Sequence, residues 1–404
     1  MRRTSPKFDI IIVGGSHTGL SLAAGLGAVG FRVLCLERSP RPKVSKVLRD
    51  GRTLALSHRS VEFLKSADVW SLLQSQTCPI LDIRVADQDS SFTLDFDHTE
   101  IGTHPFGYII ENDLFKQGLE KRLRRLSNVS IIYDATVEDM AVDSVQRTIF
   151  LKDGRRFSAP LVIAADGRLS KCRSLIGIET YGWNYHQTAV VCTIAHDRPH
   201  HNVAVEHFLP GGPFATLPMT HQRSSIVWTE TTKSATALMA LSDKEFMGFL
   251  QEKVEPYLGN IKWLGARFSY PLTLQHAKQY TAERFVLVGD AAHGIHPIAG
   301  QGLNLGMGDI DYLVKELLSA RRLGLDLGDI SILRRYEKTR KIDNGNMVLM
   351  TDLLDRLFSN AHPTLQALRR FGLGTVQRWP GLRHFFMRTA MGDTPMKTKR
   401  STTH

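Results

Sequence analysis

The sequence predicts an α/β fold of two interleaved lobes: one parallel sheet, one mostly antiparallel sheet, and a helical C-terminus. Three observations support this prediction. The chain begins with a strand–helix–strand pattern, residues 180–275 change to aromatic and β-branched runs split by polar turns, and the chain from Gly302 is almost wholly helical in pattern. With 404 residues the chain also exceeds one ordinary domain.

The N-terminal pattern is a βαβ unit. Residues 8–13 are typical of a strand buried on both faces, Thr18–Val29 of a helix packed closely on a sheet, and Phe31–Glu37 of a second buried strand. A unit of about 30 residues is expected for two parallel strands and their crossover, and it indicates a Rossmann-like sheet. The uncharged stretch from Ile10 to Phe31 superficially resembles a signal peptide or membrane span. Because glycines break it repeatedly, we interpret it as strand, turn and helix.

The remaining elements alternate between the two lobes. A loop and then a helix are predicted for Asp50–Val69, strands around Leu81–Phe96, and a helix for Asn112–Leu126. Further strands are predicted at Val129–Tyr133, Arg147–Leu151, Leu161–Ala165, His186–Ile194, Val203–Leu209, Phe214–Pro218, Ser224–Thr229 and Arg284–Val288, with a helix near Asp243–Val254. We therefore expect one lobe from residues 1–75, 111–180 and 279–340, the other from 76–110 and 181–278, and a C-terminal helical region over 341–404.

Composition and charge exclude several classes of protein. Hydrophobic residues at 42% and charged residues at 23% are typical of a folded globular chain. The formal charge of +11 does not come with any recognisable nucleic-acid-binding motif, so no nucleic-acid partner is expected. The four cysteines lack metal-ligand or disulfide-scaffold spacing, which predicts reduced structural thiols in a cytoplasmic setting. Their positions are Cys35, Cys78, Cys172 and Cys192.

The first segment that carries chemistry follows the first strand directly. It reads Gly14-Gly15-Ser16-His17-Thr18-Gly19 and opens a helix. Glycine is needed where the chain reverses and where backbone approaches a pyrophosphate, and the helix N-terminus then supplies free N–H groups. Ser16 replaces the usual second glycine, and Glu37 at the end of the second strand is placed to accept ribose hydroxyls. An ordinary glycine-rich turn is the alternative interpretation.

Two further segments also follow buried strands. Asp166-Gly167 is by itself compatible with a simple turn. The segment from Gly289-Asp290 to Gly306 is more specific, because a proline-punctuated loop leads into a glycine-rich turn that opens a helix near Gly302. His293 and His296 lie in this segment, but no third ligand stands at a plausible spacing, so no metal site is predicted.

Together the three segments resemble the FAD-dependent aromatic hydroxylase family, in particular its ubiquinone-biosynthesis branch, over nearly the whole chain. Residues 206–218, which contain His207-Phe208 and Gly212-Pro213-Phe214, resemble that branch, as do Asp343-Asn344 and Leu357-Phe358-Ser359-Asn360. The resemblance implies that FAD is the cofactor. It assigns cofactor binding to Gly14, Gly15, Ser16, Gly19, Glu37, Arg38, Arg52, Asp166, Gly289, Asp290, Pro297, Gly300, Gly302, Leu303 and Asn304. Asn112 departs from the family, many of whose members carry arginine at this position.

The resemblance also implies an activity. NADPH or NADH would reduce FAD, O2 would supply the oxygen atom, and a polyprenylated phenol would be hydroxylated on its ring. His207, Phe208, Phe214 and Pro297 are candidates for the substrate pocket, although core packing is the more ordinary role for both phenylalanines. We assign no general base. A flavin halogenase is disfavoured because the chain lacks the Trp-x-Trp-x-Ile-Pro segment. Two alternatives stay open, a hydroxylase of another small aromatic and a non-catalytic, FAD-stabilised component of a quinone-biosynthesis complex.

The C-terminus concentrates the positive charge. Residues 356–400 hold nine Lys and Arg residues against one acid, Asp393. Aromatic side chains such as Trp379, Phe385 and Phe386 stand among the arginines, which is compatible with a packed helix or with a helix resting on anionic lipid. In the second case Arg369, Arg370, Arg378, Arg383 and Arg388 would contact the membrane. We therefore expect a peripheral location on the inner face of the membrane.

Overall fold

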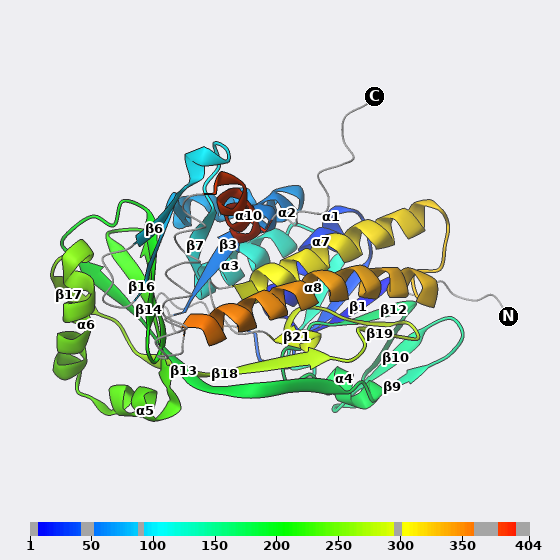
Figure 1. Ribbon diagram of the computed structural model, residues 1–404. Coiled ribbons are helices and arrows are strands. Elements are labelled where there is room, and N and C mark those ends of the chain that lie inside the picture. The colour runs from blue at the N-terminus through cyan, green and yellow to red at the C-terminus, as the bar shows by residue number, and fades with distance from the viewer. Residues whose placement is uncertain (1–6, 42–51, 88–92, 295–300, 359–378, 393–404) are drawn as a thin grey trace.

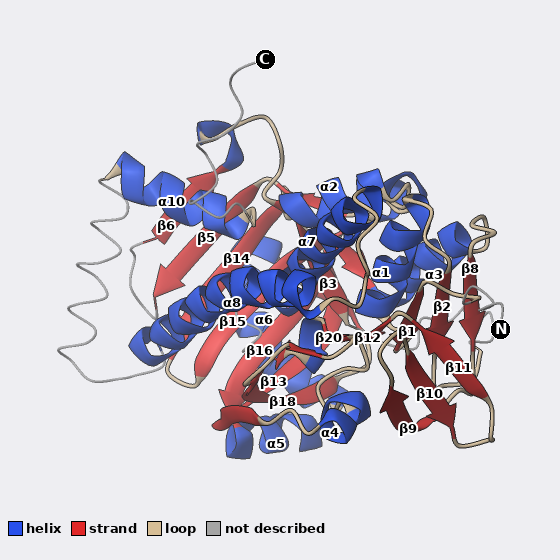
Figure 2. Cartoon of the chain, turned by 90° about the vertical axis from the view of Figure 1, so that its right-hand side faces the viewer, coloured by secondary structure: helices blue, strands red, loops and turns tan. Residues whose placement is uncertain are grey.

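The protein has two lobes joined by a long β-ribbon and flanked by two long helices (Figure 1, Figure 2). The computed structural model describes residues 7–41, 52–87, 93–294, 301–358 and 379–392. These residues show the mixed α/β fold and the helical C-terminus that the sequence predicts. All four cysteines are buried and free, as predicted from their spacing.

The first lobe is built on a six-stranded, mainly parallel sheet. Its strands stand in the order β19–β20–β12–β1–β2–β8, and only β19 runs antiparallel. Side chains of β1, β2 and β12 are buried along their whole length, which explains the continuous apolar runs in the sequence. The elements are β1 (Ile10–Val13), α1 (His17–Ala28), β2 (Val33–Leu36), α3 (Asn112–Leu123), β8 (Val129–Ile132), β12 (Leu161–Ala164), α4 (Lys171–Ile176), β19 (Thr281–Ala282) and β20 (Phe285–Leu287).

The second lobe is a nine-stranded, mainly antiparallel sheet. Its strands are β5 (Asp82–Asp87), β6 (Thr93–Asp97), β13 (Thr180–His196), β14 (Val203–Leu209), β15 (Gly212–Met219), β16 (Arg223–Thr231), β17 (Ile261–Leu264), β18 (Phe268–Ala277) and β21 (His293–Gly294). β13 and β18 form the ribbon that connects the lobes. One face of this sheet is covered by α5 (Thr232–Ala240) and α6 (Asp243–Leu258), whose apolar side chains share a core with β13, β15 and β16.

Two smaller sheets complete the β-structure. β3 (Thr53–Ser57) and β4 (Cys78–Ile80) both pair with β7 (Gly107–Glu111), while β9 (Val137–Val142), β10 (Arg147–Leu151) and β11 (Arg156–Ala159) form a meander. The sequence prediction of a loop over the first part of Asp50–Val69 was wrong for β3. This strand depends on pairing with β7, about fifty positions later in the chain, a partner that local periodicity does not reveal. The helix α2 (His58–Ser66) follows β3 as expected, and 3₁₀ turns lie at η1 (Trp70–Leu72), η2 (Gln74–Gln76), η3 (His98–Glu100) and η4 (Gly289–Ala291).

The C-terminal helices are α7 (Gln301–Arg322), α8 (Ile330–Phe358) and α10 (Pro380–Ala390). α10 inserts Met387 into a cluster that also contains Phe96 and Phe208. Arg383 of α10 donates to the carbonyl of Asp95 at 2.6 Å and forms an ion pair with Glu100, so this arginine is directed at the protein, not at a lipid surface as the sequence suggested. Arg369, Arg370 and Arg378 lie outside the described residues. None of the described helices is both long and apolar enough to cross a membrane.

Candidate flavin and substrate site

The glycine turn before α1 is closely packed against the second motif. Gly14 has a φ of +106°, and a Cβ at this position would lie 2.3 Å from the carbonyl oxygen of Ala165. A Cβ on Gly19 would lie 1.8 Å from the carbonyl oxygen of Gly14. Glycine is therefore required at both positions by backbone contact. Ser16 is the N-cap of α1, and its side chain makes no capping bond. The N-terminus of a helix favours an anion such as a pyrophosphate.

Glu37 lies beside this turn at the end of β2, and its carboxylate already accepts two backbone hydrogen bonds. The N–H of Gly15 donates to Oε2 at 2.6 Å and the N–H of Ser39 donates to Oε1 at 2.8 Å. Each carboxylate oxygen keeps a second lone pair for a ribose hydroxyl. These bonds orient the buried carboxylate toward the turn, whereas the neighbouring Arg38 is exposed.

The third motif packs on the first. Gly289 has a φ of +58°, and a Cβ here would lie 2.9 Å from Cγ2 of Thr18 in α1. Gly306 of α7 meets the same pair, since its Cβ would lie 3.3 Å from Cα of Gly289. Asp290 next to this contact has an exposed carboxylate, as a ribityl-binding group requires. In the second motif, Asp166 accepts the N–H of Cys172 at 3.0 Å.

A buried polar network centred on Asp309 holds Gly289 and His293 of the third motif in place. Asp309 of α7 accepts the N–H of Gly289 at 3.0 Å, lies 2.5 Å from Nε2 of His293, and accepts Nε of Arg340 at 2.7 Å. Asn344 donates to the same carboxylate at 3.3 Å. Burial alone would raise the pKa of Asp309, but His293 and Arg340 hold it well below its usual range. Sequence reasoning missed Asp309 and Arg340, which are 31 positions apart and carry no local motif.

The same network continues to the ribbon between the lobes. Asn344 donates to the hydroxyl of Tyr280 at 3.3 Å, Tyr280 contacts Nε2 of His276, and Nδ1 of His276 lies 2.6 Å from the hydroxyl of Tyr181. Burial lowers the pKa of His276 to about 4, so this imidazole is neutral at pH 7. The chain of contacts couples α8 to β13 and β18, and thereby fixes how the two lobes meet.

The N-terminus of α7 presents Gly302 and Leu303, both partly accessible. The side chain of Asn304 joins α7 to β3 and α2: Oδ1 accepts the N–H of Ser57 at 2.9 Å, and Nδ2 donates to the carbonyl of Ala55 at 2.8 Å. Asn304 therefore holds the start of α7 in place with its side chain.

Arg52, at the start of β3, is exposed and stands over the ring of Tyr270 in β18 at 5.1 Å from its centroid. This contact places the arginine where the two lobes meet. Two other predicted cofactor residues, Pro297 and Gly300, lie outside the described residues.

Strand register divides the predicted pocket residues between two faces of the large sheet. His207 pairs with Phe214, and Phe214 pairs with Trp228, so their side chains share the face covered by α6. Phe214 is 1% exposed and packs edge-on against Trp228, which is a core role. The opposite face carries Phe208 and its strand neighbour Glu206. His207 and Phe214 are thus separated from the face on which Phe208 lies.

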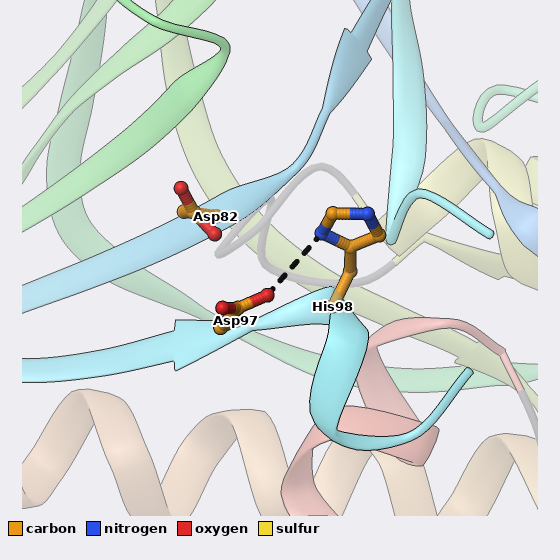
Figure 3. Close-up of side chains that lie close together, drawn as sticks. All are labelled: Asp82, Asp97 and His98. Carbon is orange, nitrogen blue, oxygen red and sulfur yellow. Dashed lines mark ion pairs between the residues drawn. The ribbon is translucent and has the colours of Figure 1, made fainter. Parts of the chain in front are cut away.

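One group of possible metal ligands occurs among the described residues, away from the glycine motifs. Asp82, Asp97 and His98 bring one ligand atom each to within 4.8 Å of one another (Figure 3). His98 Nδ1 lies 3.5 Å from Asp97. Burial and the nearby Asp97 raise the pKa of Asp82. Side chains of this group are partly exposed, and exposed acidic clusters of this kind are common in proteins without a metal.

Comparison with known proteins identifies the family of the chain. Residues 7–345 match the family model described as FAD binding domain. The chain is 42% identical to ubiquinone hydroxylase UbiL of Rhodospirillum rubrum, over 95% of this chain and 89% of the relative. It is 32% identical to 3-demethoxyubiquinol 3-hydroxylase of Escherichia coli, over 96% of this chain and the full length of the relative.

A solved structure shows the same fold. The p-nitrophenol 4-monooxygenase PnpA of Pseudomonas putida superposes with a TM-score of 0.79, covering 97% of this chain and 100% of that chain. The two sequences are 19% identical, so the likeness concerns the fold.

Proposed function

Because the chain belongs to the FAD binding domain family, we propose that it is an FAD-dependent monooxygenase that hydroxylates the ring of a polyprenylated phenol in ubiquinone biosynthesis. NADPH or NADH and O2 are the co-substrates. The names of the two relatives described above, both of which this chain covers over most of their length, support a quinone precursor as the substrate. Bound FAD supplies the redox chemistry and the activation of O2.

The main support is that three segments far apart in the sequence pack against one another. Gly14 meets the backbone of Ala165, and Gly289 meets Thr18. A glycine turn, a helix N-terminus without a side-chain cap and the exposed residue Asp290 are thereby brought together. Each of them alone has an ordinary structural explanation, whereas their combination suits a dinucleotide with a pyrophosphate and a polyol chain.

The chain's own residues would divide the work as follows. N–H groups of the first turn of α1 would bind the pyrophosphate, Glu37 the adenosine ribose, and Asp290 the ribityl hydroxyls. Backbone at Gly302 and Leu303 would line the isoalloxazine ring. The buried bonds of Asp309 would hold Gly289 in the conformation that presents Asp290.

Two measurements test the proposal. The purified protein should be yellow and should release about one equivalent of FAD on denaturation; absence of flavin even after reconstitution would refute it. Mass spectrometry of quinone intermediates in a deletion strain should reveal one accumulating polyprenylated phenol, whose structure identifies the hydroxylated carbon. Normal quinone levels in that strain, with flavin present in the protein, would favour a hydroxylase of another small aromatic.

We further propose that α10 rests on an anionic membrane, from which the prenylated substrate enters. Trp379 is 69% exposed and Phe385 39% exposed, and the side chain of Arg388 is also exposed. Met387 on the same helix is buried, so α10 is held to the protein by one side and offers the other. Aromatic and basic residues in this arrangement favour the interface of anionic lipid.

Liposome flotation tests this second proposal. Binding should require anionic lipid and weaken with salt, and the double variant Trp379→Ser, Phe385→Ser should bind several-fold less. Arg383→Gln is the matched control, because that arginine binds Glu100 and Asp95. Equal recovery with neutral and anionic vesicles would show that α10 is ordinary packing.

A further inference from the structure

Glu206 is the only acidic or basic residue in a row of five cross-strand neighbours. Strand register places Val85 of β5, Glu206 of β14, Ala215 of β15, Val227 of β16 and Val191 of β13 next to one another across the large sheet. Directly paired residues project to the same face. A single carboxyl group therefore stands in an otherwise aliphatic row, on the face that α6 does not cover.

This face is the one that meets the flavin-binding lobe. The side chain of Ser225 in β16 projects from the same face of the sheet as Glu206. Its Oγ accepts a hydrogen bond from Oγ1 of Thr53, the residue after Arg52, at 2.9 Å. Because β15 lies between β16 and β14, Glu206 on β14 stands two strand spacings, roughly 10 Å, from β16. On the other side, Phe208 joins the cluster into which α10 inserts Met387. Glu206 thus stands between the proposed membrane helix and the start of β3.

No described residue forms a hydrogen bond or an ion pair with the carboxyl of Glu206, although its side chain is only partly accessible. Burial raises the pKa of this group to about 7, and no neighbouring charge contributes. Four ion pairs hold charged groups of the surrounding elements: Arg84 with Asp95, Arg223 with Glu111, Arg383 with Glu100, and Asp97 with His98. The other titratable groups on these elements, which form no described ion pair, are Asp82, Cys78, Tyr108, His384 and Arg388. On α8, which crosses β15, Arg340 pairs with Asp309 and Asp343.

A partly buried carboxyl without a protein partner costs stability, and groups of this kind cluster at functional sites. We propose that Glu206 binds the hydroxyl of the phenol substrate and accepts its proton during hydroxylation. The O–H bond of the phenol breaks, an O–H bond forms on the carboxylate, and the oxygen's electron pair is released toward the ring carbon that attacks the activated oxygen. This inference rests on the proposed function, which supplies FAD, NAD(P)H and O2.

Binding tests the location of Glu206 without any turnover. The probes are 2-prenylphenol with one isoprene unit and its methyl ether, which has no hydroxyl proton, and binding is followed by perturbation of the flavin absorbance. Wild-type protein should prefer the phenol several-fold, and Glu206→Leu should abolish that preference. Equal preference in wild type and variant would overturn the assignment.

Kinetics test the proton transfer. Glu206→Gln keeps size and hydrogen bonding but cannot accept the proton, so kcat should fall by about 100-fold or more, while KM and FAD content change little. Wild-type kcat/KM should decline as pH falls below about 7, since the base becomes protonated, and this limb should be absent in Glu206→Gln. Glu206→Asp should retain part of the rate.

The control is Glu252→Gln, the same chemical change at an exposed position of α6 on the opposite face of the sheet. It should behave as wild type. A Glu206→Gln enzyme within twofold of wild type would refute the role in proton transfer. If wild type forms no hydroxylated product but Glu206→Leu still abolishes the preference for the phenol, the proposed activity fails and the substrate contact stands.

Discussion

Asp309 is a fully buried carboxyl group and Glu206 a partly buried one, and their surroundings in the two lobes differ. Asp309 accepts hydrogen bonds from backbone, arginine and asparagine and contacts a histidine. Its pKa lies well below the usual range, despite burial. Glu206 has no described partner, and burial raises its pKa to about 7. The difference lies in the surroundings and not in the type of residue.

The difference indicates a structural role for Asp309 and a chemical role for Glu206. A buried carboxylate with all its lone pairs used is held in one ionisation state and one position, which suits a residue that fixes a loop. A carboxyl without partners changes its ionisation near neutral pH, which suits proton transfer. We therefore expect substitutions of Asp309 to affect stability and FAD retention together, and substitutions of Glu206 to affect turnover.

The largest effect should follow from Asp309→Asn. The variant removes one of the two ion pairs of buried Arg340, which keeps Asp343, and turns an acceptor oxygen into an NH2 group that faces buried N–H donors. Together these changes should lower the free energy of unfolding by about 3–5 kcal/mol at pH 7. Urea unfolding and FAD content measure the loss. Asp311→Asn is the control, because its pair with Lys315 involves an exposed lysine and its partly buried pair with Arg59 is long, at 3.5 Å, so both should contribute less than the pair of Asp309 with Arg340. The contribution of Asp309 is present above the unfolded pKa of about 4 and is lost as pH falls below it. A wild-type-like unfolding curve for Asp309→Asn would remove the distinction between the two carboxyls.

An intermediate effect is expected for Asp290→Ala. Asp290 is an exposed carboxylate beside the network, so its removal should leave the fold intact. FAD affinity should fall by about 1.5–3 kcal/mol, roughly 10- to 150-fold, if a ribityl hydroxyl loses its acceptor. Flavin titration of the apoprotein gives the affinity, and thermal unfolding without FAD gives the matched control. Unchanged affinity would remove Asp290 from the proposed site.

The smallest effect, and one of opposite sign, is predicted for Glu206→Gln. The folded-state pKa of about 7 exceeds the unfolded value, so the native state binds the extra proton and loses stability as pH rises from about 4.5 through 7. Replacing the carboxyl with an amide should stabilise the protein by on the order of 1 kcal/mol at pH 8 and by nothing at pH 4. Unfolding curves at the two pH values decide this. Destabilisation at pH 8 would show that Glu206 is a structural carboxyl after all.

The sequence alone was sufficient wherever function depends on short-range chemistry. Gly14 and Gly19 are recognisable because a tight turn between a strand and a helix leaves no room for a Cβ. The strands at 10–13, 33–36 and 161–164 are recognisable because both of their faces are buried. The same holds for the helix that begins near Gly302. These features are encoded within a few neighbouring residues, so local patterns report them.

Tertiary structure alone decided which residues meet across the chain. β3 forms because β7 pairs with it. Asn304 joins α7 to β3 because its side chain accepts a hydrogen bond from the N–H of Ser57. His207 and Glu206 are adjacent in sequence, yet the pleat sends them to opposite faces, and only the pairing with β15 shows which face is covered by α6. Local composition sets what a residue can do chemically, whereas long-range pairing sets its partners, its burial and hence its pKa.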